Sequence, residues 1–290
     1  MGKVRIITDT ACDLPVEFLK EQGIRVVPMT INFADRSYED GFDLSRDEFY
    51  HLLTTAAKLP TTAQPTPGAF VRVLKEVTQE GEEAIAITIS SGMSGTHESA
   101  LMAREELEQK EQVTVFDSRT ASLGEGLLVL KAWEMAEAGA DRAEIIRELT
   151  EIRARLLSVF TLDTLEYLQK GGRVSKVQAV VGEILSVKPI LEVDREGRIV
   201  PREKARGRRR ALKRLLEIMA EEGRDLANQL VTIGHSRCPE EAASFAEEIK
   251  QLYGVKQLRI EEISSTVGTH TGPGCLAVFF QGEAVSPTEG

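Results

Sequence analysis

The chain has 290 residues, of which 42% are hydrophobic and 28% charged, and its net charge at pH 7 is −10. This is the composition of a globular protein that folds in water, and no apolar run approaches the ~20 residues needed to span a bilayer. The acidic balance disfavours a general nucleic-acid role, so we expect neither stable membrane insertion nor nucleic-acid binding. The length suits about two domains of roughly 150 residues each.

Cysteine and histidine usage argues against metal chemistry. The three cysteines are far apart and odd in number, which disfavours a disulfide framework or a cysteine-based zinc site. The four histidines show no His-x-x-x-His or His-x-His spacing. We therefore predict no metal and no cofactor. The N-terminus passes directly into a strand without the apolar segment of a signal peptide, so we expect a cytoplasmic protein.

The first elements are a strand at residues 4–7, followed by a loop that contains Asp9 and Asp13, and a second strand at 24–31. A polar excursion ends in a short helix near 46–53. The next loop, at 59–67, is framed by prolines.

Thr62 and Gln64 should project from this stiff loop, and Thr66 followed by Pro67 indicates a helix start. The same side chains would also suit a loop in which Thr and Gln only satisfy turn backbone.

A strand followed by a helix is predicted across residues 85–100, and the loop 90–96 between them is rich in hydroxyls. This loop lies at the carboxyl end of a buried strand and at a helix N-terminus, where ligands and anions bind in open α/β sheets. A further strand at 113–116 is followed by a hydroxyl-rich loop at 117–126, and a helix at 141–156 begins with capping-box spacing.

Strands that alternate with helices indicate a doubly wound parallel sheet, so we assign residues 1–160 to an α/β domain of that kind. A short helix from Asp163 should end at Gly171-Gly172, directly before Arg173. A hairpin around Gly197 marks a different organisation, and we assign residues 161–290 to a second α/β domain with a mixed sheet. Its other predicted elements are a helix at 207–222, a strand at 230–233, a helix at 239–252, and strands at 257–263 and 276–280.

The charge is uneven along the chain. Residues 195–214 contain ten Lys or Arg and two Glu, a net +8, which leaves −18 on the remainder. This stretch is either a solvated hairpin and helix face or a docking surface for a phosphate or an acidic partner. Further on, three glycines and a proline surround His270 in residues 267–274 and predict a tight turn that presents the imidazole, although a lone histidine is more often structural.

Taken together, these loops resemble the DegV family of bacterial fatty-acid-binding proteins, which includes acyl-carrier subunits of a fatty acid kinase. The resemblance covers nearly the whole chain. The motifs that carry it are Thr8-Asp9-Thr10 with Asp13-Leu14-Pro15, Thr62-Ala63-Gln64-Pro65, residues 90–96, Asp117-Ser118, residues 163–168 with Gly171-Gly172-Arg173, and residues 270–274. The chain departs from the usual pattern at Ala63, where the family commonly has Ser, and at His97, where Tyr is common.

The resemblance implies that one long-chain fatty acid lies in a buried apolar tunnel and that Thr62, Ser94 and His270 hold its carboxylate. Gly95 and Thr96, which follow Ser94, are assigned to the ligand-binding site as well. It also implies a carrier that is not itself an enzyme and that presents the carboxylate to a separate ATP-dependent fatty acid kinase. Arg173 and the basic stretch around Arg206 look like docking positions for that kinase.

Elementary energetics agree with these implications. A carboxylate moved into an apolar site needs several donors at one end, and hydroxyls with an imidazole meet that need. At roughly 0.8 kcal/mol per buried CH₂, a long chain gains on the order of 10 kcal/mol before the cost of immobilisation. The chain shows no Walker-type loop for ATP.

Two other functions fit parts of the sequence. The 90–96 loop would suit the phosphate of a sugar phosphate in an isomerase-like enzyme, with His270, Asp9 or Asp117 as the base. The 195–214 stretch would suit a DNA-associated regulator, although aromatic stacking residues are scarce there and the acidic remainder repels a phosphate backbone.

Overall fold

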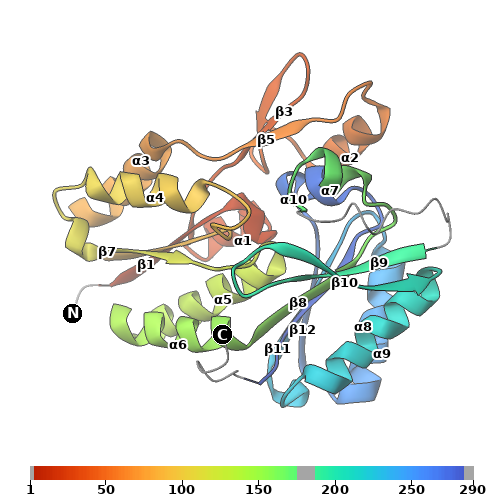
Figure 1. Ribbon diagram of the computed structural model, residues 1–290. Helices are drawn as coiled ribbons and strands as arrows, with labels where there is room; N and C mark the ends of the chain where they lie inside the picture. Colours follow the sequence, from red (N-terminus) through yellow and green to blue (C-terminus); the bar gives the residue numbers. More distant parts are fainter. Residues whose placement is uncertain (1–2, 175–186, 284–290) are drawn as a thin grey trace.

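The computed structural model describes residues 3–174 and 187–283, and it shows an α/β fold with a parallel sheet and a mixed sheet (Figure 1). The first sheet has the order β2-β1-β6-β7, and all its neighbouring strands pair in parallel. Its strands are β1 Val4–Asp9, β2 Arg25–Val27, β6 Glu83–Thr88 and β7 Val113–Asp117. The predicted parallel sheet is therefore confirmed.

Helices cover both faces of this sheet, as expected for a doubly wound fold (Figure 1). α3 Pro67–Gln79 and α4 Thr96–Glu105 pack on one face, and α5 Leu123–Glu137 and α6 Arg142–Arg155 pack on the other. The starts of α3 and α6 follow the sequence signals, because Thr66 caps α3 and α6 opens with a capping box.

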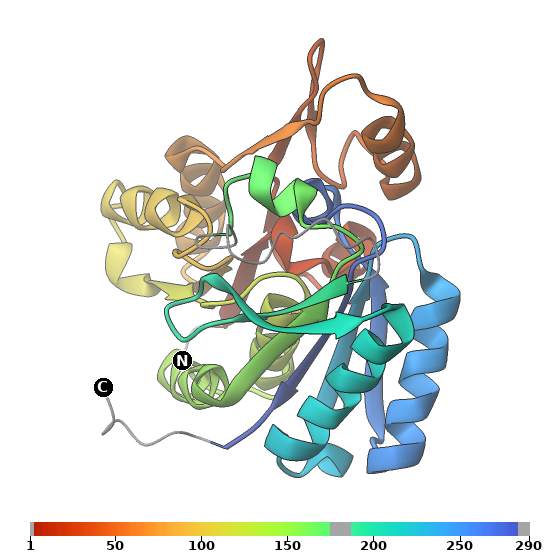
Figure 2. The ribbon, with the colours of Figure 1, turned by 45° about the vertical axis from the view of Figure 1, so that its right-hand side comes forward.

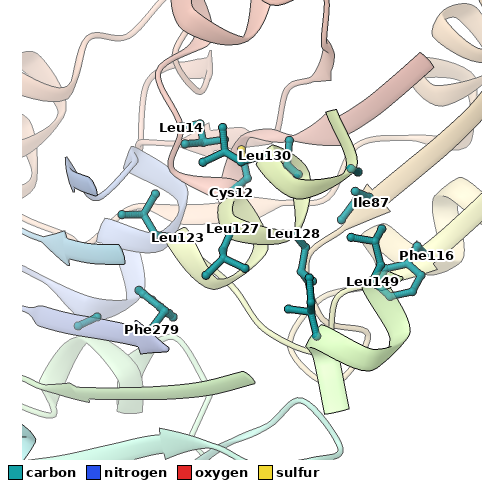
Figure 3. Packing of buried hydrophobic residues seen from close by; sticks show 14 of the residues in the cluster. Cys12, Leu14, Ile87, Phe116, Leu123, Leu127, Leu128, Leu130, Leu149 and Phe279 are labelled. Atoms are coloured by element: carbon teal, nitrogen blue, oxygen red, sulfur yellow. The ribbon is translucent and has the colours of Figure 1, made fainter. Parts of the chain in front are cut away.

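Sequence periodicity did not reveal helix α5, which lies between the two large sheets (Figure 3). The hydroxyl-rich loop expected to reach residue 126 ends at Ser122, and the helix begins at Leu123. Leu127 and Leu128 are buried in one core with Phe279 of the second sheet. Every residue from Leu123 to Leu130 is buried, so the first half of α5 has no exposed polar face to create a 3.6-residue period.

The second sheet has the order β10-β9-β8-β13-β11-β12 (Figure 2). Its pairs are antiparallel except β11 with β12, so it is mixed, as predicted. Its strands are β8 Leu156–Thr161, β9 Val187–Val193, β10 Ile199–Arg206, β11 Leu230–His235, β12 Gln257–Glu262 and β13 Leu276–Gln281. α8 Arg208–Glu222 and α9 Pro239–Tyr253 pack against it. β8 starts before residue 161 but belongs to the second sheet. The division into domains 1–160 and 161–290 stays a prediction.

A small antiparallel sheet of the order β4-β3-β5 lies at the top of the view in Figure 1. Its strands are β3 Thr30–Asn32, β4 Ser37–Glu39 and β5 Thr61–Ala63. The single strand predicted at 24–31 is wrong in one respect, because it divides into β2 and β3, which belong to different sheets. The remaining helices are α1 Val16–Glu21, α2 Arg46–Thr55, α7 Glu166–Lys170 and α10 Ser265–Thr271, with 3₁₀ turns at Thr10–Cys12, Lys110–Gln112 and Leu226–Asn228.

Carboxyl groups are buried where β1 meets α5. Asp9 accepts hydrogen bonds from the backbone N–H groups of Ala11 and Ile89, both at 2.9 Å, yet its burial raises its pKa to about 7. Glu125 Oε1 accepts a hydrogen bond from Thr8 at 3.0 Å, and Oε2 has no partner among the described residues. Burial, and then the nearby charge of Asp9, raise the pKa of Glu125 well above its usual value.

We expect the variant Glu125→Gln to gain stability over the wild type as the pH rises. The raised folded-state pKa means that the folded wild type holds its proton more tightly than the unfolded chain, so stability falls as pH rises from about 4.3 towards the folded pKa. Glutamine does not titrate, so the difference in unfolding free energy should grow as the pH rises from about 5 towards the folded-state pKa of Glu125. Urea unfolding across this range measures it. The matched control Glu76→Gln, on the exposed surface of α3, should differ from the wild type equally at each pH. A constant difference for Glu125→Gln would contradict the expectation.

Candidate functional site

His270 lies in the last turn of α10, so the predicted tight turn is wrong. Ser264 caps this helix, and both oxygens of buried Asp40 accept hydrogen bonds from the backbone N–H groups of Ser265 and Thr266. Glycine is needed at position 268 inside the helix, because a Cβ there would lie 2.8 Å from the hydroxyl of Tyr50. The glycines therefore serve close packing here, and the imidazole is held on a short rigid element.

Thr62 lies in β5, directly opposite Ile31 of β3, and not in an irregular loop. Its Oγ1 lies 2.9 Å from His270 Nε2, within hydrogen-bond distance. These two residues are 208 positions apart in the chain. Figures 1 and 2 show how this happens, since α10 packs beside α7 and against β5. The structure thus brings together two of the three residues assigned to the carboxylate by resemblance.

Ser94 lies in the loop between β6 and α4. Its Oγ is 2.9 Å from Thr96 Oγ1 and accepts a hydrogen bond from the backbone N–H of Thr96 at 3.3 Å. Gly95 is required for close approach, because a Cβ there would lie 2.0 Å from Oε1 of Gln64. Earlier in the loop, the hydroxyl of Ser90 donates a hydrogen bond to the carbonyl of Gly197 at 2.7 Å. The hydroxyl of Ser90 is therefore engaged by the hairpin between β9 and β10.

Thr62, Ser94, Arg173 and His270 line one small cavity of about 60 Å³. Gly95 and Thr96 do not line it, and Thr96 is fully buried behind Ser94. The rest of the wall is mostly apolar. It consists of Met29, Ile89, Met93, Ala121, Leu168, Ile199, Thr266, Val267 and Thr271. The polar groups predicted from distant loops thus converge at one end of an apolar space.

An open groove of about 720 Å³ meets the same residues from outside. Thr62, Arg173 and His270 line both the groove and the inner cavity. The groove is more polar and runs between residues 53–62 and the short helix α7. These three side chains therefore stand at the boundary between an apolar interior and an accessible polar surface.

The imidazole of His270 is electrically neutral at physiological pH. Burial, and then the positive charge of Arg173, lower its pKa to about 4. Its Nδ1 is buried without a hydrogen-bond partner among the described residues. Gly171 makes this position possible, because a Cβ on that residue would lie 2.2 Å from Nδ1. A neutral imidazole at this place can offer one N–H without bringing a buried charge of its own.

Arg173 is exposed and is fixed by backbone carbonyls. Its Nε donates to the carbonyl of Met93 at 3.3 Å, and its NH1 donates to the carbonyl of Gly171 at 2.6 Å. No acidic side chain of the described chain pairs with it. This residue, which we predicted as a docking position, also places a cation at the mouth of the cavity.

The basic stretch at 195–214 carries less free charge than its sequence suggests. Arg202, Arg208 and Arg214 form ion pairs with glutamates from β9, β10, α8 and α9. Arg206, at the end of β10, is exposed and pairs with no acid that the structure describes, and the same holds for Arg209. Arg206 and Arg209 thus place unpaired charge where β10 meets α8, whereas Arg195, which also forms no ion pair with the described residues, lies in the hairpin between β9 and β10.

Within the described ranges 3–174 and 187–283, no cluster of three or more His, Cys, Asp or Glu could hold a metal ion. In the same part of the chain, no helix has the length and apolar character to cross a membrane.

Residues 3–283 match the model of a family described as the uncharacterised proteins of the DegV family. A DegV domain-containing protein of Caldanaerobacter subterraneus is 37% identical over 281 residues, which are 97% of this chain and 99% of that protein. Protein DegV of Bacillus subtilis is 34% identical over 276 residues, covering 95% and 98%. The chain belongs to the DegV family.

Solved structures of DegV-family proteins share this fold. A Thermus thermophilus protein described for its fatty acid binding superimposes with a TM-score of 0.88 at 30% identity, covering 97% of this chain and all of that one. DegV of Bacillus subtilis, described as a fatty acid binding protein, gives a TM-score of 0.86 at 32% identity, covering 98% and 100%. The family and the fold expected from the sequence motifs are confirmed.

Proposed function

We propose that this DegV-family chain binds one long-chain fatty acid and presents its carboxylate to a separate ATP-dependent fatty acid kinase for acyl-phosphate formation. Thr62, Ser94 and His270 hold the carboxylate, and the acyl tail occupies the apolar space behind them. The observation that carries the proposal is that Thr62, Ser94 and His270 line one largely apolar cavity, and that Thr62 and His270 also line the open polar groove outside it. The description of solved relatives as fatty-acid-binding proteins supports the ligand class.

The donors match the needs of a half-buried carboxylate. The Ser94 hydroxyl can donate to it directly. Thr62 and the neutral imidazole of His270 are hydrogen bonded to each other, so this pair keeps one proton with which to donate to the carboxylate. Charge-assisted hydrogen bonds of this kind are the strong ones. The guanidinium of Arg173 lies at the same cavity and offsets part of the negative charge. Gly95 and Thr96 then act through Ser94, because the Thr96 hydroxyl and N–H fix its oxygen and Gly95 lets Gln64 approach.

The tail requires the cavity to widen. Ligand pockets usually measure roughly 300 to 1,000 Å³, whereas this one measures about 60 Å³. Met29 and Met93 line it, and methionine has three rotatable bonds that allow it to repack around irregular shapes. We therefore propose that the methionines move aside as the acyl chain enters.

Mass spectrometry of lipid extracted from the purified protein tests the ligand class, and titration with a long-chain fatty acid tests the residues. Thr62→Ala should weaken binding roughly threefold to tenfold, because one hydroxyl donor is lost. The neighbouring Thr61→Ala is the matched control, since Thr61 lies on the same strand and lines the groove but not the inner cavity. Protein without bound lipid that also fails to take up fatty acid would refute the proposal, as would equal losses in both variants.

We expect Arg206→Glu to weaken phosphorylation of the carried fatty acid by the kinase while leaving fatty-acid affinity unchanged. The exposed arginine carries a charge that no acid of the described chain neutralises, so reversing it should slow association with a partner of opposite charge. The measurement is the kinase rate at several carrier concentrations, beside a lipid titration. Arg173→Glu is the comparison. Because Arg173 also lines the cavity, that variant should lose lipid affinity as well, and unchanged affinity would assign it to docking alone.

A further inference from the structure

A second cleft, of about 510 Å³, lies on another part of the molecule. Residues 118–120, the C-terminal turn of α6 and the hairpin of β9 and β10 form its walls. It shares no lining residue with the inner cavity or the outer groove of the proposed fatty-acid site. An inference about this cleft therefore does not rest on the proposed function.

Three arginines in this cleft lack a counter-charge. Arg119, Arg153 and Arg195 line it, and none of them forms an ion pair with any residue that the structure describes. Other arginines engage the cleft's acidic residues. Arg202 pairs with Glu192 and Glu222, Arg198 with Asp194, and Arg224 with Glu283. Arg202 serves two glutamates, so these six arginines and four acids together leave a net charge of +2 at a concave site.

Two contacts fix the guanidinium group of Arg153 in the cleft. Its guanidinium lies 4.6 Å from the centroid of the Phe116 ring and donates to the carbonyl of Asp117 at 2.7 Å. Burial, and then the charge of Arg119, lower the pKa of Arg153. The carboxylate of Asp117 is occupied by the hydroxyl of Ser91 and the backbone of Arg119.

Arg119 itself has a backbone φ of +53°, in the left-handed region that favours glycine. Backbone strain of this kind tends to occur where a side chain has a function. The conformation places Arg119 against the hairpin, because a Cβ on Gly197 would lie 3.1 Å from its Cα. Two cations that repel each other and one strained backbone position therefore coincide in the same cleft.

We propose that this cleft binds a phosphate dianion through Arg119, Arg153 and Arg195. Guanidinium groups present forked donors that suit phosphate oxygens, and a dianion would neutralise most of their combined charge. The phosphate is either free or carried by a small organic molecule. A small organic molecule would fit, because the volume of the cleft is well within the range of small-molecule sites, roughly 300 to 1,000 Å³. Its apolar part could contact Leu156, Leu157 and Val193, which also line the cleft.

Isothermal titration of the full chain with inorganic phosphate, and separately with adenosine 5′-monophosphate as a monoester, tests the proposal. We expect saturable binding that weakens at least tenfold in the double variant Arg119→Gly, Arg195→Ser. Tighter binding of the monoester than of phosphate would indicate an organic carrier, and equal affinities would indicate free phosphate. Arg209→Ser is the matched control, because Arg209 is exposed and lies outside the cleft. It should bind as the wild type does.

Thermal unfolding gives a second readout that a folding defect would not mimic. Without phosphate, the double variant should be at least as stable as the wild type, because glycine suits the positive φ and the repulsion with Arg153 is removed. Added phosphate should raise the midpoint of the wild type and of Arg209→Ser but not that of the double variant. Absence of saturable binding to both probes, or unchanged affinity in the double variant, would overturn the proposal.

Discussion

Replacing His270 by alanine should weaken fatty-acid binding about tenfold to a hundredfold. A hydrogen bond to a charged group contributes roughly 1.5 to 3 kcal/mol, and each 1.4 kcal/mol is a factor of ten in Kd. The loss should be at least as large as for Thr62→Ala, because either substitution removes one member of the pair joined at 2.9 Å. The Kd from titration of the purified, delipidated protein measures the effect.

Two further variants distinguish a lost donor from lost structure. His270→Gln retains an N–H donor of similar reach and should recover part of the affinity. His51→Ala, on the exposed surface of α2, removes a histidine far from the cavity and should bind as the wild type does. If His270→Ala retained full affinity, the carboxylate assignment would be wrong even if the protein still contained lipid.

The variant Gly171→Ala should cost nearly as much affinity as the loss of His270, although it removes no donor. An added methyl group would lie 2.2 Å from His270 Nδ1, so the imidazole must move. The 2.9 Å contact between its Nε2 and the Thr62 hydroxyl would then be lost. Alanine is compatible with the backbone at this position, where φ is −74° and ψ is −12°. We therefore expect a loss of about tenfold or more in affinity with a small change in the free energy of unfolding.

Gly172→Ala provides the opposite result at the next residue. Nothing lies within 4 Å of a Cβ placed there, but the backbone φ is +68°. This variant should lose about 1 kcal/mol of stability and keep its fatty-acid affinity. Urea unfolding and lipid titration on both variants separate the two effects. Equal affinity in Gly171→Ala and Gly172→Ala would show that the position of the imidazole does not matter.

Local sequence signals predicted much of this fold because they act over a few residues. Thr66 before Pro67 marked the start of α3, and Asp141 with Glu144 marked that of α6. The helix α10 was mistaken for a turn because its glycines are set by tertiary contact, since Gly268 lies against Tyr50. Intrinsic propensity counts glycine as a helix breaker and cannot represent a neighbour 218 residues away in the chain.

The proposed site shows the same limit. The sequence placed hydroxyls at strand ends, but residue spacing alone cannot bring Thr62 to His270, and their pairing came from family resemblance. The net charge counted along residues 195–214 also exceeds the unpaired positive charge that the structure leaves there. Arg202 and Arg214 are neutralised by glutamates on neighbouring elements, some of them outside the counted segment. Linear charge counting omits partners that only folding brings close.

The two aspartates that bind the N-terminus of α10 bear on when the chain becomes able to bind fatty acid during its synthesis. Asp40 binds the N–H groups of Ser265 and Thr266, and Asp13 binds that of Ser264. The ribosome therefore makes both anchors more than 200 residues before the helix that they hold. A chain translated only as far as Ser94 has Thr62 and Ser94 but no His270, so we expect fatty acid to be captured only after α10 has been made and has docked on these aspartates.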